Sequence, residues 1–216
     1  MKKAKILLLI LPCVLCLLIG TANATIMLYT GVEGGSGDVQ NVLFNEPGLI
    51  ATGFTVQGVL NQTNEIVDFT GLETLTTPPG GQARVVAVDG SLNYLNIMMH
   101  DTTAGFGKIQ FNIDALVSGV VNLTFADQDG TLFSWSPTVG EHGANWFTAI
   151  ASDGEVIASA TIASNFGAFI GISDVQQVRL GPGTGSNPVP EPATMLLLGF
   201  GLMGTAAFGR KKLFKK

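Results

Sequence analysis

Apolar and polar residues alternate along short segments through the middle of the chain. The alternation is clearest at residues 109–113, 121–125 and 146–151, where every second side chain is apolar or aromatic. A period of two is typical of β-strands that bury one face and expose the other. Between the two ends of the chain, no segment carries an apolar stripe at helical spacing that is long enough to compete. The pattern therefore predicts an all-β domain.

Turn signals separate these segments. Asp89-Gly90, Asp129-Gly130 and Asp153-Gly154 each lie between two strand-like runs. Asp-Gly is preferred in two-residue type I′ hairpins, because both central residues need a positive φ. Turn signals recur roughly every 8 to 15 residues, which predicts about ten to twelve strands. With no helix to cover a sheet, two sheets must cover each other, so we expect an antiparallel β-sandwich, jelly-roll-like, over residues 25–181.

The N-terminal 24 residues have the composition of a signal peptide. A basic start at residues 1–5 precedes an apolar run at residues 6–20, and Ala22 and Ala24 supply the small residues that signal peptidase accepts. Cleavage is expected before Thr25. A retained membrane helix is the alternative, but the apolar run is short for that and the cleavage site argues against it.

The C-terminal end has three successive parts after a linker at residues 182–188, which is rich in Gly and Pro. Residues 193–209 are uncharged, and as a helix they would span about 25 Å, marginal for a bilayer core of about 30 Å. We expect a single transmembrane helix there, with the basic tail on the cytoplasmic side. The flanking residues are Val189, Pro190, Glu191 and Pro192 before the helix, and Arg210, Lys211 and Lys212 after it.

The order and spacing of these parts over residues 189–216 resemble the PEP-CTERM sorting signal of Gram-negative bacteria. The resemblance implies recognition by exosortase, a membrane-bound transpeptidase-like enzyme, with cleavage near residues 190–192 and release or transfer to the outside. An ordinary tail anchor is the alternative, although it does not require Pro-Glu-Pro at its outer edge. Segments within residues 40–181, such as 68–71 and 145–148, also resemble the secreted β-domains of PEP-CTERM proteins of this size.

What the resemblance implies for localisation is an exported protein of the cell envelope, outer surface or extracellular matrix. PEP-CTERM proteins are associated with bacteria that make exopolysaccharide and biofilm. The expected partners are therefore signal peptidase, exosortase, the membrane through a transient C-terminal anchor, and an exopolysaccharide.

Charge and cysteine content narrow the function further. Residues 25–185 carry three cations (Arg84, Lys108 and Arg179) and 15 carboxylates, for a net charge of −12. Such a surface repels nucleic acid and keeps the domain soluble. Cys13 and Cys16 both lie in the N-terminal apolar run, so the mature domain has neither disulfides nor a zinc–thiolate site.

No catalytic residue stands out. His100 precedes Asp101 and His142 follows Glu141, but neighbouring residues in a strand point to opposite faces, so neither pair forms a relay by sequence alone. There is no Gly-x-Ser-x-Gly motif and no mature cysteine. Many acids could supply the two carboxylates of a glycosidase, yet no pair is marked out. We expect a protein that is not an enzyme.

One acidic turn suggests a metal. Asp127 and Asp129 offer alternate carboxylates in a tight turn, and calcium favours several oxygen ligands from flexible loops. The downstream bidentate Glu of an EF-hand loop is missing, and an ordinary hairpin turn explains the same residues. A structural calcium ion is kept as a hypothesis, and no other cofactor is expected.

Three aromatic residues are candidates for sugar binding: Trp135, Trp146 and Tyr94. Lectin-like sandwiches bind sugars through exposed aromatics with Asp, Asn and Gln, although aromatics in a sandwich also fill the core. Trp135 lies near a strand end and is expected to be the most exposed of the three.

Two functions follow. The first is a non-catalytic cell-surface or matrix protein, which predicts no discrete pocket. The alternative is a carbohydrate-binding module, which predicts an aromatic-lined hollow with converging polar groups.

Overall fold

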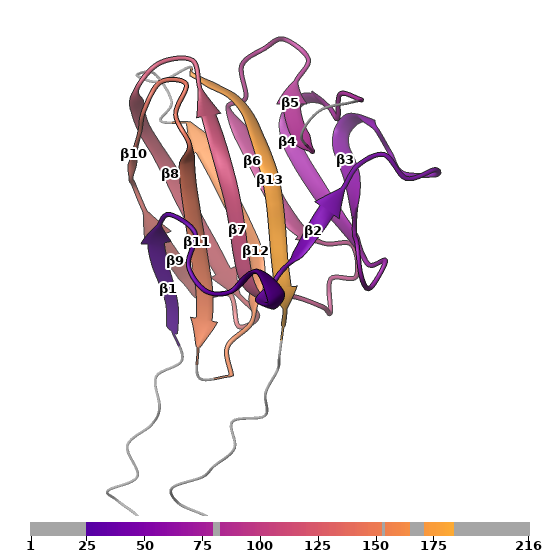
Figure 1. The fold of residues 1–216 in the computed structure, drawn as a ribbon, viewed down its shortest axis with the longest axis vertical. Coiled ribbons are helices and arrows are strands. Elements are labelled where there is room, and N and C mark those ends of the chain that lie inside the picture. The colour runs from indigo at the N-terminus through magenta and orange to yellow at the C-terminus, as the bar shows by residue number, and fades with distance from the viewer. Residues whose placement is uncertain (1–24, 80–82, 153, 165–170, 184–216) are drawn as a thin grey trace, which may run out of the picture. The chain divides into compact units, whose positions relative to one another are not determined.

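The computed structural model describes residues 25–79, 83–152, 154–164 and 171–183 (Figure 1). These residues form thirteen β-strands and one 3-10 turn. The elements are β1 (Thr25–Thr30), η1 (Ser36–Asp38), β2 (Gln40–Leu43), β3 (Thr52–Leu60), β4 (Ile66–Thr76), β5 (Arg84–Ala87), β6 (Tyr94–Met99), β7 (Phe106–Ala115), β8 (Gly119–Asp127), β9 (Leu132–Trp135), β10 (Thr138–Val139), β11 (Asn145–Ser152), β12 (Ile157–Ser164) and β13 (Ile172–Pro182).

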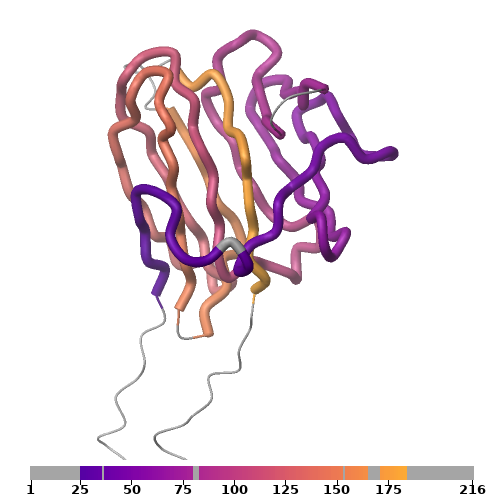
Figure 2. Tube along the Cα trace, in the orientation of Figure 1, coloured from indigo at the N-terminus to yellow at the C-terminus, as the bar shows by residue number. Residues whose placement is uncertain are grey.

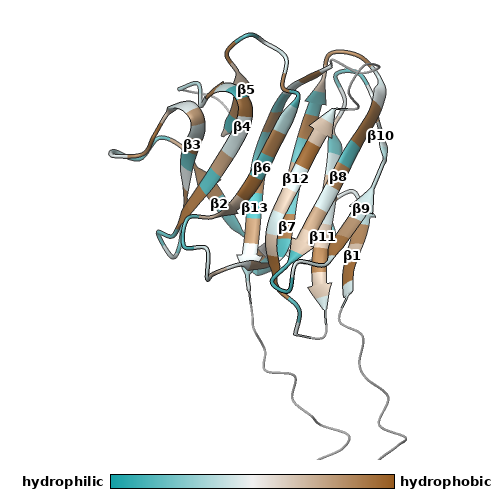
Figure 3. Ribbon diagram, turned by 180° about the vertical axis from the view of Figure 1, so that it is seen from behind, coloured by the Kyte–Doolittle hydropathy of each residue, from teal (hydrophilic) through white to brown (hydrophobic). Residues whose placement is uncertain are grey.

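All the strand pairings are antiparallel, in the order β1-β11-β7-β13-β2-β3-β4-β6-β12-β8-β10. Strand β9 pairs with β8, and β5 bridges β13 and β4. Figures 1 and 3, seen from opposite sides, show two layers: β1, β11, β7 and β13 in one, and β6, β12 and β8 in the other. A pairing of Ile157 with Phe106 joins β12 back to β7 and closes a circuit of seven strands.

The predicted all-β, antiparallel fold is confirmed, with one difference in architecture. The two layers are joined through strand pairings, whereas a sandwich keeps two separate sheets. The signal peptide and the C-terminal helix at residues 193–209 lie outside the described residues, as does most of the linker. In the described part of the chain, no helix has the length and apolar character needed to cross a membrane.

The core lies between the two layers and is built from the apolar face of each strand. The largest buried side chains include Phe69, Phe106, Phe111 and Phe125, each less than 2% exposed. Burying one such ring contributes about 1.5–3 kcal/mol relative to leaving it in water. On β8 the predicted alternation is confirmed, because residues 121, 123 and 125 are buried while 122 and 124 are partly exposed.

The Asp-Gly turns differ from the prediction. Asp129-Gly130 does connect paired strands, β8 and β9. However, Gly130 has φ +83° and Asp129 has no positive φ, and the Gly130 N–H donates to the Asp127 carbonyl at 3.1 Å. This is a type I turn followed by a left-handed glycine, so type I′ was wrong here. Asp89-Gly90 joins β5 to β6, which do not pair, and Asp153 lies outside the described residues.

A segment after β1 covers half of the outer face of the β11–β7–β13 layer. It runs from Gly31 to Asp38 and crosses in front of these strands (Figure 2). The Gln110 amide donates to the Glu33 carbonyl at 2.7 Å, and the Thr148 hydroxyl donates to the Gly31 carbonyl at 2.7 Å. Both side chains are only 1% exposed. The other half of this face stays uncovered.

Candidate functional site

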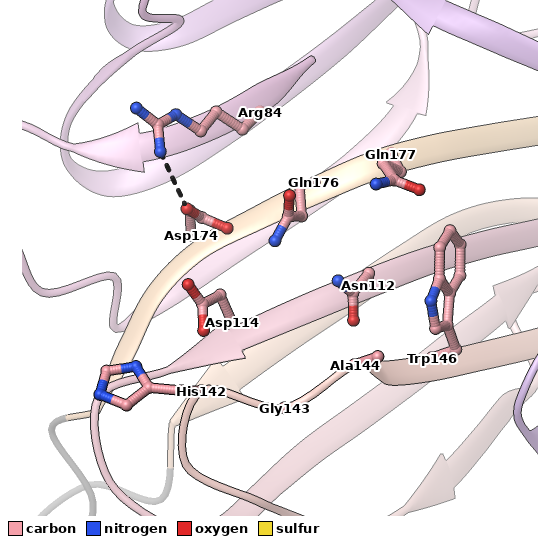
Figure 4. Close-up of a pocket in the computed structure, with 10 residues that line it drawn as sticks. All are labelled: Arg84, Asn112, Asp114, His142, Gly143, Ala144, Trp146, Asp174, Gln176 and Gln177. Atoms are coloured by element: carbon pink, nitrogen blue, oxygen red, sulfur yellow. Dashed lines mark ion pairs between the residues drawn. The ribbon is translucent and has the colours of Figure 1, made fainter. Parts of the chain in front are cut away.

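The uncovered half of this face is a polar hollow of about 580 Å³ (Figure 4). Strands β11, β7, β13 and β5 form it, together with the loop before β11. The ten lining residues are Arg84, Asn112, Asp114, His142, Gly143, Ala144, Trp146, Asp174, Gln176 and Gln177. Its volume is within the range of about 300–1,000 Å³ that is usual for ligand sites.

Strand register sets the lining side chains in two rows across the sheet. Trp146 pairs with Asn112, Asn112 with Gln176, and Gln176 with Arg84, which makes one row across β11, β7, β13 and β5. In the next row, Asp114 of β7 pairs directly with Asp174 of β13. Side chains directly opposite in a sheet have Cβ atoms about 4.5–5.5 Å apart. The two rows therefore gather one aromatic ring, two amides, one guanidinium and two carboxylates from different parts of the chain.

A β-bulge in β13 shapes the same surface. The register shifts between Gln176 and Arg179, and Gln177 has φ +54°. Val175 and Val178, three residues apart, both face the core, so the bulge holds one extra residue on the outer side. Bulges often re-aim side chains beside functional sites. Here the bulge adds Gln177 to the hollow.

The bulge also sets the position of Arg179 beside Trp146. The guanidinium carbon lies 5.1 Å from the centroid of the Trp146 ring. A cation–π contact at a partly exposed site contributes about 0.5–1 kcal/mol. The backbone carbonyl of Trp146 accepts a hydrogen bond from Gly31 at 2.7 Å, so both the ring and its strand are held in place.

The two carboxylates are poorly compensated. Asp174 is 4% exposed, and its Oδ2 lies 3.6 Å from Nη1 of Arg84, whose side chain is 45% exposed. Burial and then repulsion from Asp114 raise the pKa of Asp174, against the opposing effect of Arg84, to about 6. Asp114 makes no ion pair with any residue that the structure describes. Like charges directly opposite in a sheet are destabilising, so stability alone does not favour this pair.

Two further features of the hollow are energetically unfavourable: buried oxygens without hydrogen bonds, and non-glycine residues with a positive φ. Among the described residues, three buried side-chain oxygens have no hydrogen-bond partner, and two of them, Asn112 Oδ1 and Asp174 Oδ1, belong to the hollow. Each such atom costs about 1–3 kcal/mol. His142 (φ +49°) and Gln177 are also two of the three non-glycine residues with positive φ in the same ranges. Strain and unmet polar atoms of this kind cluster at binding sites.

The predicted sugar-binding aromatics do not come together. Trp146 lines the hollow. Trp135 instead packs inward, edge-to-face against the buried Phe147 at 5.4 Å between ring centroids. Tyr94 lies on β6 in the other layer, paired with Ala163. One of the three candidates therefore belongs to the hollow, and its neighbours there are polar residues of β7 and β13.

The histidines lie apart from each other. His142, at the edge of the hollow, has Nε2 3.6 Å from Oε1 of the exposed Glu141. His100 contacts Asp68 on β4, with 2.8 Å between Nδ1 and Oδ2, and not its neighbour Asp101. Two hydrogen bonds from Thr103 lower the pKa of Asp101. The prediction that the protein is not an enzyme stays a prediction.

Of the two candidate calcium ligands, Asp127 has a structural hydrogen-bond partner. Asp127 is 6% exposed, and its Oδ1 accepts a hydrogen bond from the Thr131 N–H at 2.8 Å, as expected of a hairpin turn. Asp129 is exposed. Burial and then the charges of these two carboxylates raise the pKa of Glu155. Within the described ranges, no three His, Cys, Asp or Glu side chains are grouped to hold a metal. Calcium binding stays a prediction.

Apart from Trp146, the residues that line the hollow were not predicted as binding residues from the sequence; on β7 and β13 these are Asn112, Asp114, Asp174, Gln176 and Gln177, and on β5 Arg84. The signal was the polar half of two strand patterns, at residues 110–114 and 174–176, where Asp, Asn and Gln alternate with apolar residues. A polar strand face by itself indicates only solvent exposure. What makes it a site is the pairing of β7 with β13, which lie far apart in the sequence.

Comparisons with solved structures give two distant likenesses. A family 29 carbohydrate binding module from Piromyces equi is 11% identical, over 74% of this chain and 92% of that chain, with a TM-score of 0.31. A mutant of the family 29 module CBM29-2 is 9% identical, over 79% of this chain and 99% of that chain, with a TM-score of 0.26. These TM-scores are too low to indicate a shared fold. No curated protein matches the chain.

The C-terminal segment gives a definite match. The family model of the PEP-CTERM protein-sorting motif covers residues 188–212. This range contains the predicted sorting residues, Val189, Pro190, Glu191 and Pro192, and the basic residues Arg210, Lys211 and Lys212. Signals of this kind mark exported proteins that are sorted to the cell envelope. The C-terminal segment of the chain is therefore a PEP-CTERM sorting motif.

Proposed function

We propose that this PEP-CTERM protein is a non-catalytic component of the cell surface or extracellular matrix of a Gram-negative bacterium, and that it binds polysaccharide through the hollow. Exosortase processes it near residues 190–192. Of the two functions that the sequence left open, a matrix protein without a ligand site predicts no discrete pocket. The hollow favours the carbohydrate-binding alternative.

The observation that carries this proposal is the row of Trp146, Asn112, Gln176 and Arg84. An aromatic ring at one end offers an apolar surface on which the face of a pyranose can lie. The amides and the guanidinium offer donors and acceptors to sugar hydroxyls. A small number of fixed polar groups beside an aromatic surface is typical of small-molecule and sugar sites.

The position of the hollow on β13 suits a tethered protein. β13 runs from Asp174, in the hollow, to Pro182, just before the sorting segment. At about 3.3 Å per residue, these points are roughly 25 Å apart along the strand. The end of the strand that leads into the C-terminal segment is therefore distant from the hollow along β13.

Trp146→Ala tests the proposal. Removing the ring deletes the apolar surface, so we expect affinity for a bound polysaccharide to fall at least about tenfold, as loss of one stacked aromatic predicts. Glycan arrays would identify the ligand, and isothermal titration calorimetry of the full-length protein would measure the affinity. Tyr94→Ala, in the other layer, is the matched control and should bind as the wild type does. A blank array, or equal affinity for Trp146→Ala and the wild type, would contradict the proposal.

A further inference from the structure

We propose that the hollow selects a polysaccharide that carries free amino groups, with an ammonium of the sugar bound between Asp114 and Asp174. This inference rests on the glycan-binding function proposed above and names the chemical class of its ligand. It concerns the row of carboxylates, whereas the function itself was argued from the row that contains Trp146.

The first argument is the arrangement of the carboxylates. Asp114 and Asp174 are directly opposite each other on neighbouring strands and on one face of the sheet. Figure 4 shows them side by side, with Arg84 reaching Asp174 from β5 and Asp114 further away. The one cation, Arg84, pairs with Asp174 alone, at a long 3.6 Å, and no ion pair with a described residue compensates Asp114. A second cation would relieve the repulsion between the carboxylates, and an ammonium is compact enough to fit between them.

The second argument is the kind of atom that lacks a partner. The two unsatisfied atoms of the hollow, Asn112 Oδ1 and Asp174 Oδ1, are both acceptors. An ammonium has three N–H donors and no acceptor, whereas an N-acetylated amine has one donor and adds a carbonyl. Both oxygens are buried, and both residues line the hollow. The terminal torsion of Asn and Asp is soft, so a small rotation turns them toward a ligand.

The other charged groups around the hollow do not favour an anionic ligand. Arg84 is engaged with Asp174, and Arg179 lies over the ring of Trp146. His142 lies at the edge beside Glu141. Over residues 25–185 the chain has a net charge of −12, which steers a polycation toward the surface and repels a polyanion.

The spacing suits an oligosaccharide. Trp146 is one strand from Asp114 and two strands from Asp174, and both carboxylates are two residues further along the strands, so the separations are about 8–12 Å. A sugar ring stacked on Trp146 therefore leaves a following sugar of the polymer beside the carboxylates. The two rows bind different parts of the same ligand: the row with Trp146 contacts a sugar ring, and the row of carboxylates binds the amino group of a following sugar.

Titration calorimetry with two matched oligosaccharides tests the inference. The probes are the hexamer of glucosamine and the hexamer of N-acetylglucosamine, which share a backbone and differ in charge. With the full-length protein, we expect the glucosamine hexamer to bind at least tenfold more tightly. Equal or tighter binding of the N-acetylated hexamer, or of an anionic uronic acid oligomer, would overturn the amine inference and leave glycan binding intact. If no glycan of any class binds, both proposals fail.

Variants that each remove one carboxylate charge distinguish binding in the hollow from attraction of the ligand by the net charge of the domain. Asp114→Asn and Asp174→Asn should each weaken binding of the glucosamine hexamer at least tenfold and leave the melting temperature no lower than that of the wild type. Asp129→Asn removes the same charge on an exposed turn away from the hollow and should bind normally. If Asp129→Asn weakens binding as much as Asp114→Asn does, the net charge of the domain explains the attraction and the site is refuted.

Discussion

At the scale of single residues, Asp174 shows how one position can serve binding at a cost to stability. The carboxylate is buried, faces Asp114, and shares a long ion pair with Arg84. An apolar residue there would remove the repulsion and the buried charge. Natural proteins are only marginally stable, so they keep destabilising buried charges mainly at sites where these groups bind a ligand or take part in a reaction.

The pKa of Asp174 gives a pH dependence with a definite sign. Folding raises it from 3.8 to about 6, so the fold favours the protonated form. This contribution to stability is present below the ordinary pKa and is lost as the pH rises through about 6. Its full size is about 2–3 kcal/mol.

Asp174→Asn should therefore raise the free energy of unfolding at pH 7.5 by about 1–3 kcal/mol, with little effect at pH 4. Urea unfolding at both pH values would measure it. Asp129→Asn, which changes an exposed carboxylate away from the hollow, should show no such difference between the two pH values. If Asp174→Asn is less stable than the wild type at pH 7.5, the buried charge is better compensated than the geometry indicates.

At the scale of elements, the pairing of β7 with β13 holds the hollow together. At the other end of this strand pair, away from the hollow, glycines let the two backbones approach closely. A side chain added at Gly107 would place its Cβ 2.7 Å from the backbone carbonyl of Pro182, and one at Gly183 would lie 2.6 Å from that of Gly105. Neither backbone can move aside without opening the ladder. The C-terminal end of β13 therefore packs closely against the start of β7, because the glycines there have no side chain to separate the two backbones.

Gly107→Ala should destabilise the domain by about 1–3 kcal/mol, because an overpacked backbone contact forces the strands apart. Gly37→Ala is the matched control, since its Cβ would meet nothing within 4 Å. Thermal unfolding of both variants would check this. Equal melting temperatures for Gly107→Ala and Gly37→Ala would mean that β7 and β13 can move apart to accept a methyl group at little cost, contrary to these distances.

The sequence predicted the strands themselves, but it did not predict how the strands pair. The alternation in β8 and β11 was enough to place strands and their buried faces, because a period of two is a local property. Asp89-Gly90 failed as a hairpin turn because pairing is not local: β5 and β6 follow each other yet have different partners. The hollow was missed for the same reason. Trp146 was recognised by type, but Asp114 and Asp174 become a pair only through strand order.

At the scale of the whole molecule, the chain combines a folded domain with a separate sorting segment. The match at residues 188–212 identifies that segment from sequence alone, because it is read as a linear motif. The hollow belongs to the fold and depends on strand pairing. These two functional parts can therefore be disabled independently.

Replacing Pro190, Glu191 and Pro192 by alanine should block processing and leave the domain folded. In an exosortase-positive host, intact mass spectrometry of the wild type should show a mature protein that lacks the basic tail, whereas the variant should keep it. Glu46→Ala, exposed in the folded domain, should be processed normally. A mature wild-type protein that retains its basic tail would contradict exosortase processing.

β13 contributes to the hollow at one end and leads into the sorting segment at the other. It is also an inner strand, hydrogen-bonded to β7 on one side and to β2 and β5 on the other. If, as proposed, polymer held in the hollow pulls against a tethered C-terminus, the force reaches β13 and loads its ladders with β7, β2 and β5 in shear. Many hydrogen bonds then resist together, and these neighbouring strands share the tension.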